Sequence, residues 1–251
     1  SFTSTTAYTV SGSAMNSLLG RLGIAADSKE AVNYRVISTL TEQYGRLVSA
    51  PMQVEVTLYS TEVVYPKLFV VGSHQGWAPS TAPALYDLSF KKIYTGYVNF
   101  PNATDEFKLT TVPSWDEPDY GSTAPGSLTL SGGSNIATSG AGYYLMTADL
   151  NTLSWKKEIM KFAVVGDAIG SWDVDRFLNY DAASNSLTLT AALSVGEIKF
   201  RANAAWTVSL GASGAENTLA FGGDNIAVSE AGTYLIRLDL SNPGNMVYSL
   251  E

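Results

Sequence analysis

The chain has 251 residues, which permits one large domain or two to three small ones. Only 15% of its residues are charged and the net charge is −8, which favours a β-rich extracellular protein and argues against nucleic acid as a partner. The absence of cysteine excludes a thiol nucleophile, a disulfide framework and a cysteine-based zinc site, and the single histidine, His74, excludes a multi-histidine metal site.

Helical periodicity occurs near the start of the chain. Met15, Leu18, Leu19 and Leu22 recur at helical spacing, which predicts a helix at about 14–23. No apolar run approaches the ~20 residues that a membrane-spanning helix needs.

Most of the remaining sequence alternates between apolar and polar residues with the two-residue period of strands. Clusters of Gly, Asn, Ser and Pro separate these runs, as turns require. The predicted strands cover 31–40, 52–59, 68–72, 92–100, 106–111, 143–150, 186–193, 197–203 and 233–240. The sequence therefore predicts an all-β protein with one short helix near its start.

An internal repeat organises the chain after its first quarter. Three segments recur in order: LFVVGSHQGW and FAVVGDAIGSW, EFKLTTVPSW and EIKFRANAAW, GGSNIATSGAGYYLMTADL and GGDNIAVSEAGTYLIRLDL. Paired positions are 90 to 94 residues apart, so insertions are expected in loops. The repeat predicts two tandem β-sandwiches, 65–158 and 159–251, after a shorter unit, 1–64, that is expected to be part of a domain.

The loop VPSWDEPDYG places Asp116, Glu117 and Asp119 beside two aromatic residues. A glycosidase needs two carboxylates at a fixed separation, so this loop is a candidate catalytic site. In the second copy Trp206 is followed by Thr207 and Val208, and no acidic cluster recurs. The repeat therefore favours a solubilising loop, and an activity retained by one copy stays open.

Both copies keep a tryptophan after their first strand, a basic residue on a middle strand and a tryptophan after the next loop. These residues are Trp77, Lys108 and Trp115 in the first copy, and Trp172, Lys199 and Trp206 in the second. Strand alternation predicts that Lys108 faces away from the core, and that Lys199 and Arg201 share a solvent-exposed face. An indole beside a cation suits a sugar, whose C–H face is apolar and whose rim carries hydroxyls.

The same aromatic residues can also serve the core, because tryptophan is often buried in β-sandwiches. Trp77 and Trp172, in turns beside glycine, suit packing and ligand contact equally. Trp115 and Trp206 are expected to lie solvent-accessible in polar loops, which favours ligand contact. Tyr120 is either a second platform or a loop anchor, and His74 is expected to be a loop residue rather than a ligand.

These motifs carry a resemblance to a known family. The order VVG…GW, then F/I-K-F/L…W, then GG-x-NI…AG-x-Y-x-x-x-x-DL resembles the tandem carbohydrate-binding domains of the SusE/SusF outer-membrane lipoproteins, which serve glycan uptake in Bacteroidetes. The resemblance covers both repeats. It extends to FTSTTAYTVSGSAMNSLLGRLGI and VNYRVIST, which are similar to the later part of the family's immunoglobulin-like first domain.

The resemblance implies cell-surface, non-catalytic binding of starch or a similar polysaccharide by aromatic platforms and a basic residue, with no cofactor or metal. Carried over, the ligand-binding residues are Trp77, Lys108, Trp115 and Tyr120, and in the second copy Trp172, Lys199, Arg201 and Trp206. The segment TVSLGASG after Trp206 lacks a second aromatic residue. Implied partners are the polysaccharide, other components of an outer-membrane uptake complex, and the membrane through an N-terminal lipid anchor that this chain does not contain.

Two other function classes remain open from the sequence. The first is a glycoside hydrolase that uses the carboxylates of the 116–119 loop. The second is a structural or adhesive surface module whose tryptophans are packed inside. Fold alone does not decide among them, because sandwich faces serve many functions.

Overall fold

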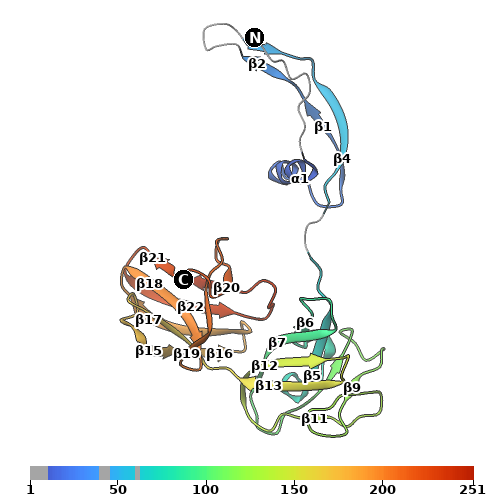
Figure 1. Ribbon diagram of the computed structural model, residues 1–251, viewed down its shortest axis with the longest axis vertical. Coiled ribbons are helices and arrows are strands. Elements are labelled where there is room, and N and C mark those ends of the chain that lie inside the picture. The colour runs from blue at the N-terminus through green and yellow to red at the C-terminus, as the bar shows by residue number, and fades with distance from the viewer. Residues whose placement is uncertain (1–10, 40–45, 60–62) are drawn as a thin grey trace. The chain divides into compact units, whose positions relative to one another are not determined.

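The computed structural model describes residues 11–39, 46–59 and 63–251, and the chain divides into two compact units, Ser1–Val64 and Tyr65–Glu251 (Figure 1). Strands dominate the described residues of both units. The prediction of an all-β protein is therefore confirmed.

The first unit combines one helix with two antiparallel strand pairs. Helix α1 (Gly12–Arg21) begins two residues earlier than predicted, and the Ser11 side chain caps it by accepting a hydrogen bond from the Ala14 N–H. Of the predicted apolar stripe, Leu19 is buried, whereas Leu18 and Leu22 are exposed.

The strands of the first unit are β1 (Lys29–Tyr34) paired with β4 (Met52–Thr57), and β2 (Ile37–Thr39) paired with β3 (Arg46–Val48). The predicted strand 31–40 thus corresponds to β1 and β2, and its last position lies outside the described residues. The immunoglobulin-like character of this unit stays a prediction.

The first copy of the repeat forms one continuous antiparallel sheet in the order β10-β9-β8-β5-β6-β7-β12-β13, with β11 beside β8. Two short 3₁₀ helices, η1 (Ser73–Gln75) and η2 (Pro79–Thr81), follow β5. Its strands are β5 (Lys67–Gly72), β6 (Ala84–Tyr86), β7 (Ile93–Phe100), β8 (Glu106–Thr110), β9 (Tyr120–Gly121), β10 (Thr129–Leu130), β11 (Ile136–Ala137), β12 (Gly142–Asp149) and β13 (Ser154–Ile159).

The second copy forms two sheets, in the orders β15-β14-β18-β19-β20, with β21 beside β18, and β16-β17-β22-β23. Its strands are β14 (Phe162–Gly166), β15 (Ser171–Phe177), β16 (Asn179–Asp181), β17 (Ser186–Leu193), β18 (Gly196–Ala202), β19 (Ala205–Ala212), β20 (Leu219–Phe221), β21 (Ile226–Val228), β22 (Gly232–Asp239) and β23 (Val247–Leu250).

The two copies correspond strand for strand. The order β10-β9-β8-β5 matches β20-β19-β18-β14, and β6-β7-β12-β13 matches β16-β17-β22-β23. Register agrees as well, since Ile136 lies opposite Phe107 and Ile226 lies opposite Ile198. Strand β6 spans the positions of the end of β15 and the start of β16, because Ala84 lies opposite Phe69 as Phe177 lies opposite Ala163. No strand of one copy pairs with the other within the described residues. A domain boundary at 158/159 stays a prediction, because 65–251 forms one compact unit.

A shared glycine explains the repeated VVG motif. A Cβ at Gly72 would lie 2.3 Å from the Glu106 carbonyl oxygen, and one at Gly166 would lie 2.1 Å from that of Glu197. Only glycine permits so close an approach of two backbones. The motif thus fixes the end of the first strand against the middle strand, just before the first tryptophan of each copy.

Aromatic residues join the two copies. Tyr97 stacks on Tyr143 with ring centroids 5.7 Å apart, and its ring meets Phe162 of the second copy edge-on at 5.8 Å. Tyr143 also contacts Tyr180 at 5.8 Å. The core of the second copy therefore includes side chains from the first.

Candidate functional site

Two tryptophans of the first copy lie together at its surface. Trp77 follows η1 in a left-handed backbone conformation, and its N–H donates to the Gly72 carbonyl at 2.8 Å. Trp115 lies in the loop between β8 and β9 and is 44% exposed. The ring centroids are 6.5 Å apart and the ring planes are tilted by 33°.

The second copy repeats this arrangement. Trp172 lies in β15 and is half-buried, and Trp206 is 48% exposed. Their centroids are also 6.5 Å apart, with a tilt of 37°. Two copies that differ in local structure therefore hold their indoles in nearly the same geometry. We call these two sets, Trp77 with Trp115 and Trp172 with Trp206, the tryptophan pairs.

Trp206 lies in a strand, so the prediction of a loop at this position is wrong. Asn203 and Ala204 both have positive φ and form a two-residue turn between the paired residues Ala202 and Ala205. Strand β19 therefore begins at Ala205, directly after the turn, and the Trp206 side chain on it is exposed. The prediction that Trp206 is solvent-accessible agrees with the structure.

Lys108 lies between the fully buried Phe107 and Leu109 and is itself only half-buried, as strand alternation predicts. Its ammonium forms an ion pair with Asp119, with 2.8 Å between Nζ and Oδ1. Sequence reasoning assigned Asp119 to a solubilising loop. The structure gives it a defined partner, whereas its neighbours Asp116 and Glu117 are exposed.

Arg201 is 5% exposed, so the prediction that it shares a solvent-exposed face is wrong. Its Nε donates to Asp175 at 2.7 Å, and Nη2 donates to the Asp173 carbonyl at 3.3 Å. The guanidinium lies 4.8 Å from the Trp206 ring centroid. The Trp206 indole and the Asp175 carboxylate of β15 thus cover the Arg201 guanidinium.

Lys199 remains half-buried and forms no ion pair with any residue that the structure describes. By register, Thr110 of the first copy occupies the position of Arg201, because Phe69 lies opposite Thr110 and Ala163 lies opposite Arg201. The first copy therefore has no guanidinium at this position.

Tyr120 is separated from the tryptophan pair. It lies opposite Leu109 in the sheet, and residues directly opposite share a face. Leu109 is fully buried, and the Tyr120 ring packs against the same core cluster. Tyr120 is thus half-buried and anchored on the core, and its role as a second platform stays a prediction.

Sequence reasoning missed Asp173 and Asp175, and it missed the ion pair between Asp119 and Lys108. Asp173 and Asp175 follow Trp172 in the segment WDVD, and only Asp175 contacts Arg201 through its side chain. The alternating carboxylates beside a tryptophan that recurs in both copies are a sequence signal for a basic partner near that tryptophan. Their partner, Arg201, could be identified only from the structure, in which β14 pairs with both β15 and β18.

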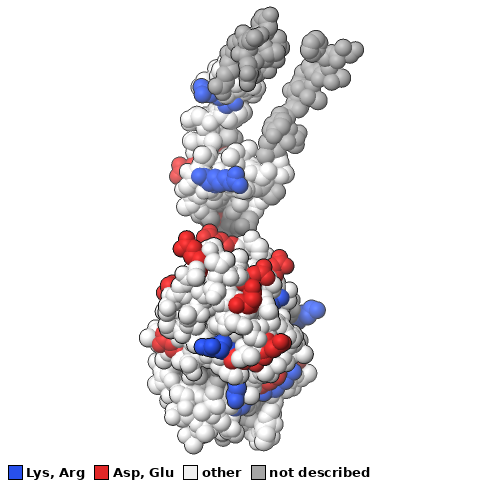
Figure 2. Space-filling view, turned by 90° about the vertical axis from the view of Figure 1, so that its left-hand side faces the viewer, with Lys and Arg blue, Asp and Glu red and all other residues white. Residues whose placement is uncertain are grey.

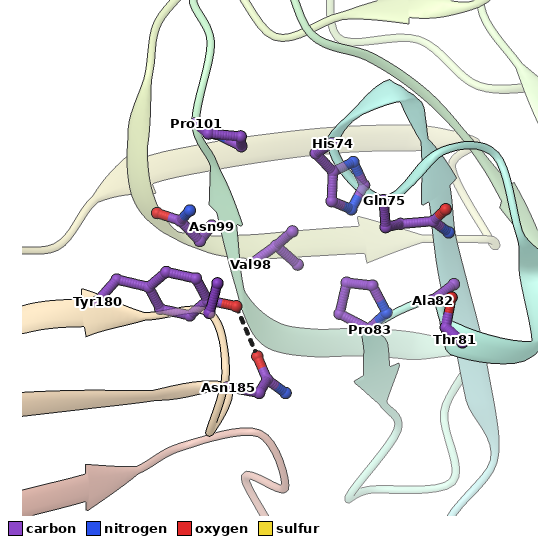
Figure 3. Close-up of a pocket in the computed structure, with 11 residues that line it drawn as sticks. His74, Gln75, Thr81, Ala82, Pro83, Val98, Asn99, Pro101, Tyr180 and Asn185 are labelled. Carbon is purple, nitrogen blue, oxygen red and sulfur yellow. Dashed lines mark hydrogen bonds between the residues drawn. The ribbon is translucent and has the colours of Figure 1, made fainter.

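A separate cleft of about 590 Å³ lies between the copies and includes His74, Pro101, Tyr180 and Asn185 in its lining (Figure 3). The Tyr180 hydroxyl donates to Asn185 Oδ1 at 2.9 Å. Burial lowers the pKa of His74 from 6.5 to about 4, although the charge of Asp105 acts in the opposite direction. The His74 ring packs edge-on against Phe100, and neither ring nitrogen has a hydrogen-bond partner.

The charge pattern, the carboxylate clusters and the helices of the described residues bear on other classes of site. On the face shown in Figure 2, Lys and Arg side chains are interspersed with Asp and Glu among large uncharged areas. No group of three or more Asp, Glu or His side chains that could hold a metal ion occurs among residues 11–39, 46–59 and 63–251. Within the same ranges, no helix is long and apolar enough to cross a membrane.

Comparisons with known proteins leave the family of the chain open. No protein-family model matches the sequence, and no curated protein matches it. Among solved structures, SusF from Bacteroides thetaiotaomicron aligns over 96% of this chain and 62% of its own, with 16% sequence identity and a TM-score of 0.34. Likeness at this level carries no inference about function, and the chain is thus similar in part to SusF without a demonstrated family.

Proposed function

We propose that the unit 65–251 binds a neutral polysaccharide at the cell surface without cleaving it, and that a starch-like α-glucan is the favoured ligand. The observation that carries this proposal is the recurrence of a tryptophan pair with one exposed and one half-buried indole, in nearly equal geometry, in both copies. An exposed indole does not stabilise the fold by burial, so its duplication at a matched position favours ligand contact.

The geometry of each pair favours a curved chain. The two indole planes are tilted by 33° in the first pair and by 37° in the second, so the rings of a pair are not coplanar. A flat, ribbon-like β-linked glucan stacks best on coplanar rings, whereas a curved α-linked glucan presents successive sugar faces at an angle. The separation of 6.5 Å brings the two indoles close enough to contact neighbouring sugar units.

Polar groups beside the pairs supply hydrogen bonds to sugar hydroxyls. The Lys108 ammonium donates to Asp119 and keeps two further donors, and the carboxylate keeps free lone pairs as acceptors. In the second copy the half-buried Lys199 is the corresponding donor. Arg201 acts differently, because its buried guanidinium contacts the Trp206 ring and orients that platform.

Several observations favour binding over hydrolysis. Asp119 is held in an ion pair with Lys108, and the second copy has no acidic cluster after its tryptophan. Glycoside hydrolysis requires an acid and a nucleophile or base on opposite sides of the scissile bond. The glycosidase alternative would have to rest on the exposed Asp116 and Glu117 of the first copy alone.

The cellular setting rests on the sequence resemblance. The SusE/SusF-like repeats support an outer-membrane, surface-exposed location through a lipid anchor, together with partnership in a glycan-uptake complex. A structural or adhesive module without a sugar site is the competing proposal. In that case tryptophan fluorescence would not respond to added glucan.

A retention assay tests the proposed function. The intact chain is incubated with insoluble starch, xylan, mannan and β-glucan, and the bound fraction and released reducing sugar are both measured. Retention on starch with no reducing sugar is the expected result, and it should persist in EDTA. Release of reducing sugar would establish hydrolysis, and retention on none of the four polymers would overturn the binding proposal.

A further inference from the structure

A second cavity lies at the open edge of the first copy. It has a volume of about 510 Å³, and its lining includes neither Trp77 nor Trp115. Loop 122–126, segment 134–139 and strand β13 form its walls. Backbone hydrogen bonds fix these walls, since Trp155 donates to Gly126 at 2.9 Å and Ser122 donates to Ser134 at 2.9 Å. We call this cavity the edge slot.

Three buried polar atoms of the edge-slot lining have no hydrogen-bond partner. They are the hydroxyl of Thr138, which is 0% exposed, the indole N–H of Trp155 and the ammonium of Lys157. The indole and the ammonium can only donate hydrogen bonds. No Asp or Glu lines the slot, so Lys157 is its one charged lining residue. Buried donors without acceptors indicate an acceptor-rich ligand.

The second copy shows that the fold does not require these polar groups. By register and repeat alignment, Thr138 corresponds to Val228, Trp155 to Tyr248 and Lys157 to Leu250. Val228 is buried, and Tyr248 and Leu250 pack against the core of the second copy. The same positions can therefore be filled by side chains that leave no buried charge.

The ammonium of Lys157 is only partly compensated. It lies 3.7 Å from the centroid of the Tyr144 ring, an attraction that is weaker than an ion pair with additional hydrogen bonds. A buried ammonium without an anionic partner destabilises a fold, and an apolar side chain of similar volume is usually better there. A lysine at this position, where the repeat has leucine, therefore points to a ligand that supplies negative charge.

We propose that the edge slot binds a small ligand through an oxyanion group, a carboxylate or a phosphate. On binding, the Lys157 side chain turns from the Tyr144 ring toward the oxyanion and donates to it, and small side-chain movements let the Trp155 indole and the Thr138 hydroxyl donate as well. The other lining residues include Ser122, Ser134 and Asn135, which can bond hydroxyls carried by the same ligand. This site is independent of the tryptophan pairs and of the proposed polysaccharide binding.

Thermal unfolding and calorimetry on the intact chain test the proposal. The probes are inorganic phosphate, glucuronate, neutral glucose as the matched sugar, and sodium chloride at equal ionic strength. Phosphate, glucuronate or both should raise the melting temperature and give a measurable Kd, while glucose and chloride should not. The responding probe identifies the oxyanion as phosphate or carboxylate. No response to either anion, or an equal response to chloride, would overturn the site.

Matched variants assign the response to the edge slot. Lys157→Leu copies the residue of the second copy, and Lys156→Leu changes the exposed neighbour on the other face of β13. Lys157→Leu should weaken anion binding about tenfold or more while its melting temperature without ligand stays equal or rises. Lys156→Leu should bind like the wild type.

A second substitution keeps the proposal testable if the Lys157→Leu variant fails to fold. Thr138→Val conserves volume, copies Val228 and should also weaken the anion response. Anion binding that is unchanged in both Lys157→Leu and Thr138→Val would contradict the proposal. Starch retention by these variants should equal that of the wild type, so a failure of the edge slot is distinguishable from a failure of the tryptophan pairs.

Discussion

Trp115 and Trp155 belong to the same copy but occupy opposite environments. Trp115 is 44% exposed, whereas Trp155 meets Phe107 edge-on at 5.3 Å and packs against the core cluster. Trp115→Ala should therefore leave the melting temperature nearly unchanged, and Trp206→Ala should lower it slightly through the lost contact with Arg201. Trp155→Ala should lower the free energy of unfolding by about 3–5 kcal/mol. Denaturant unfolding of the three variants checks this contrast, and a large loss for Trp115→Ala would place its indole in the core.

His74 predicts a pH dependence that can be assigned to one residue. Its pKa falls from 6.5 in the unfolded chain to about 4 in the folded protein. The unfolded state therefore binds more protons between these values, and stability must fall as the pH is lowered from about 6.5 to about 4. Below the folded pKa this contribution stays lost and no longer changes.

The substitution His74→Phe provides the matched test of that pH dependence. Phenylalanine preserves the ring that packs on Phe100, and neither imidazole nitrogen has a hydrogen bond to lose. The variant should be folded at pH 7, and its melting temperature should change less than that of the wild type between pH 6.5 and 5. Because the chain has one histidine, an equal slope in both proteins would contradict the assignment.

At the scale of elements, alternation predicted the strands whose two faces differ in environment. Strand β17 has the predicted bounds, and β12, β18 and β22 differ from prediction by one residue at each end. Of the strands with six or more residues, β13, β15 and β19 were not predicted. Their polar sequences lie at an edge or on an exposed surface, where no strict alternation of burial is imposed.

The candidate site likewise contains residues that the sequence alone could identify and residues whose placement it could not predict. The four tryptophans of the pairs and Lys108 could be singled out from the sequence, because the two copies of the repeat show which residue types recur at matched positions of the same fold. Tyr120 and Arg201 could not be placed, since their orientation depends on which strands lie opposite them. Tyr120 faces the core through its pairing with Leu109, and Arg201 is covered because β15 brings Asp175 onto the same face. Such cross-strand contacts are invisible to local periodicity.

The turn before Trp206 gives a prediction at this scale. Ala204 has φ of 54° in a two-residue hairpin turn, a conformation that costs an alanine about 1–2 kcal/mol and glycine almost nothing. Ala204→Gly should therefore stabilise the protein by up to about 1 kcal/mol. The neighbouring Asn203 should stay, because its side chain accepts from the Lys161 N–H and donates to the Ile159 carbonyl. Lower stability of Ala204→Gly in denaturant unfolding would show that the turn is not strained.

At the scale of the whole unit 65–251, two similar sites on one chain predict a dependence on ligand length. Contact through one tryptophan pair is expected to be weak, about millimolar or −4 kcal/mol. A polymer that reaches both sites makes the second contact intramolecular, which can raise avidity by roughly 10²–10⁴. Titration with a graded series of maltooligosaccharides should show this gain only for long chains in the intact protein. An equal gain in Trp206→Ala would mean that the sites act independently.

The central claim is that the tryptophan pairs of both copies bind glucan. It is tested most directly by binding isotherms on starch for the wild type, Trp115→Ala, Trp206→Ala, the double variant and Lys156→Leu as a surface control. Each single variant should bind more weakly than the wild type, the double variant should lose retention, and the control should match the wild type. Undiminished starch binding by a folded double variant would contradict the claim.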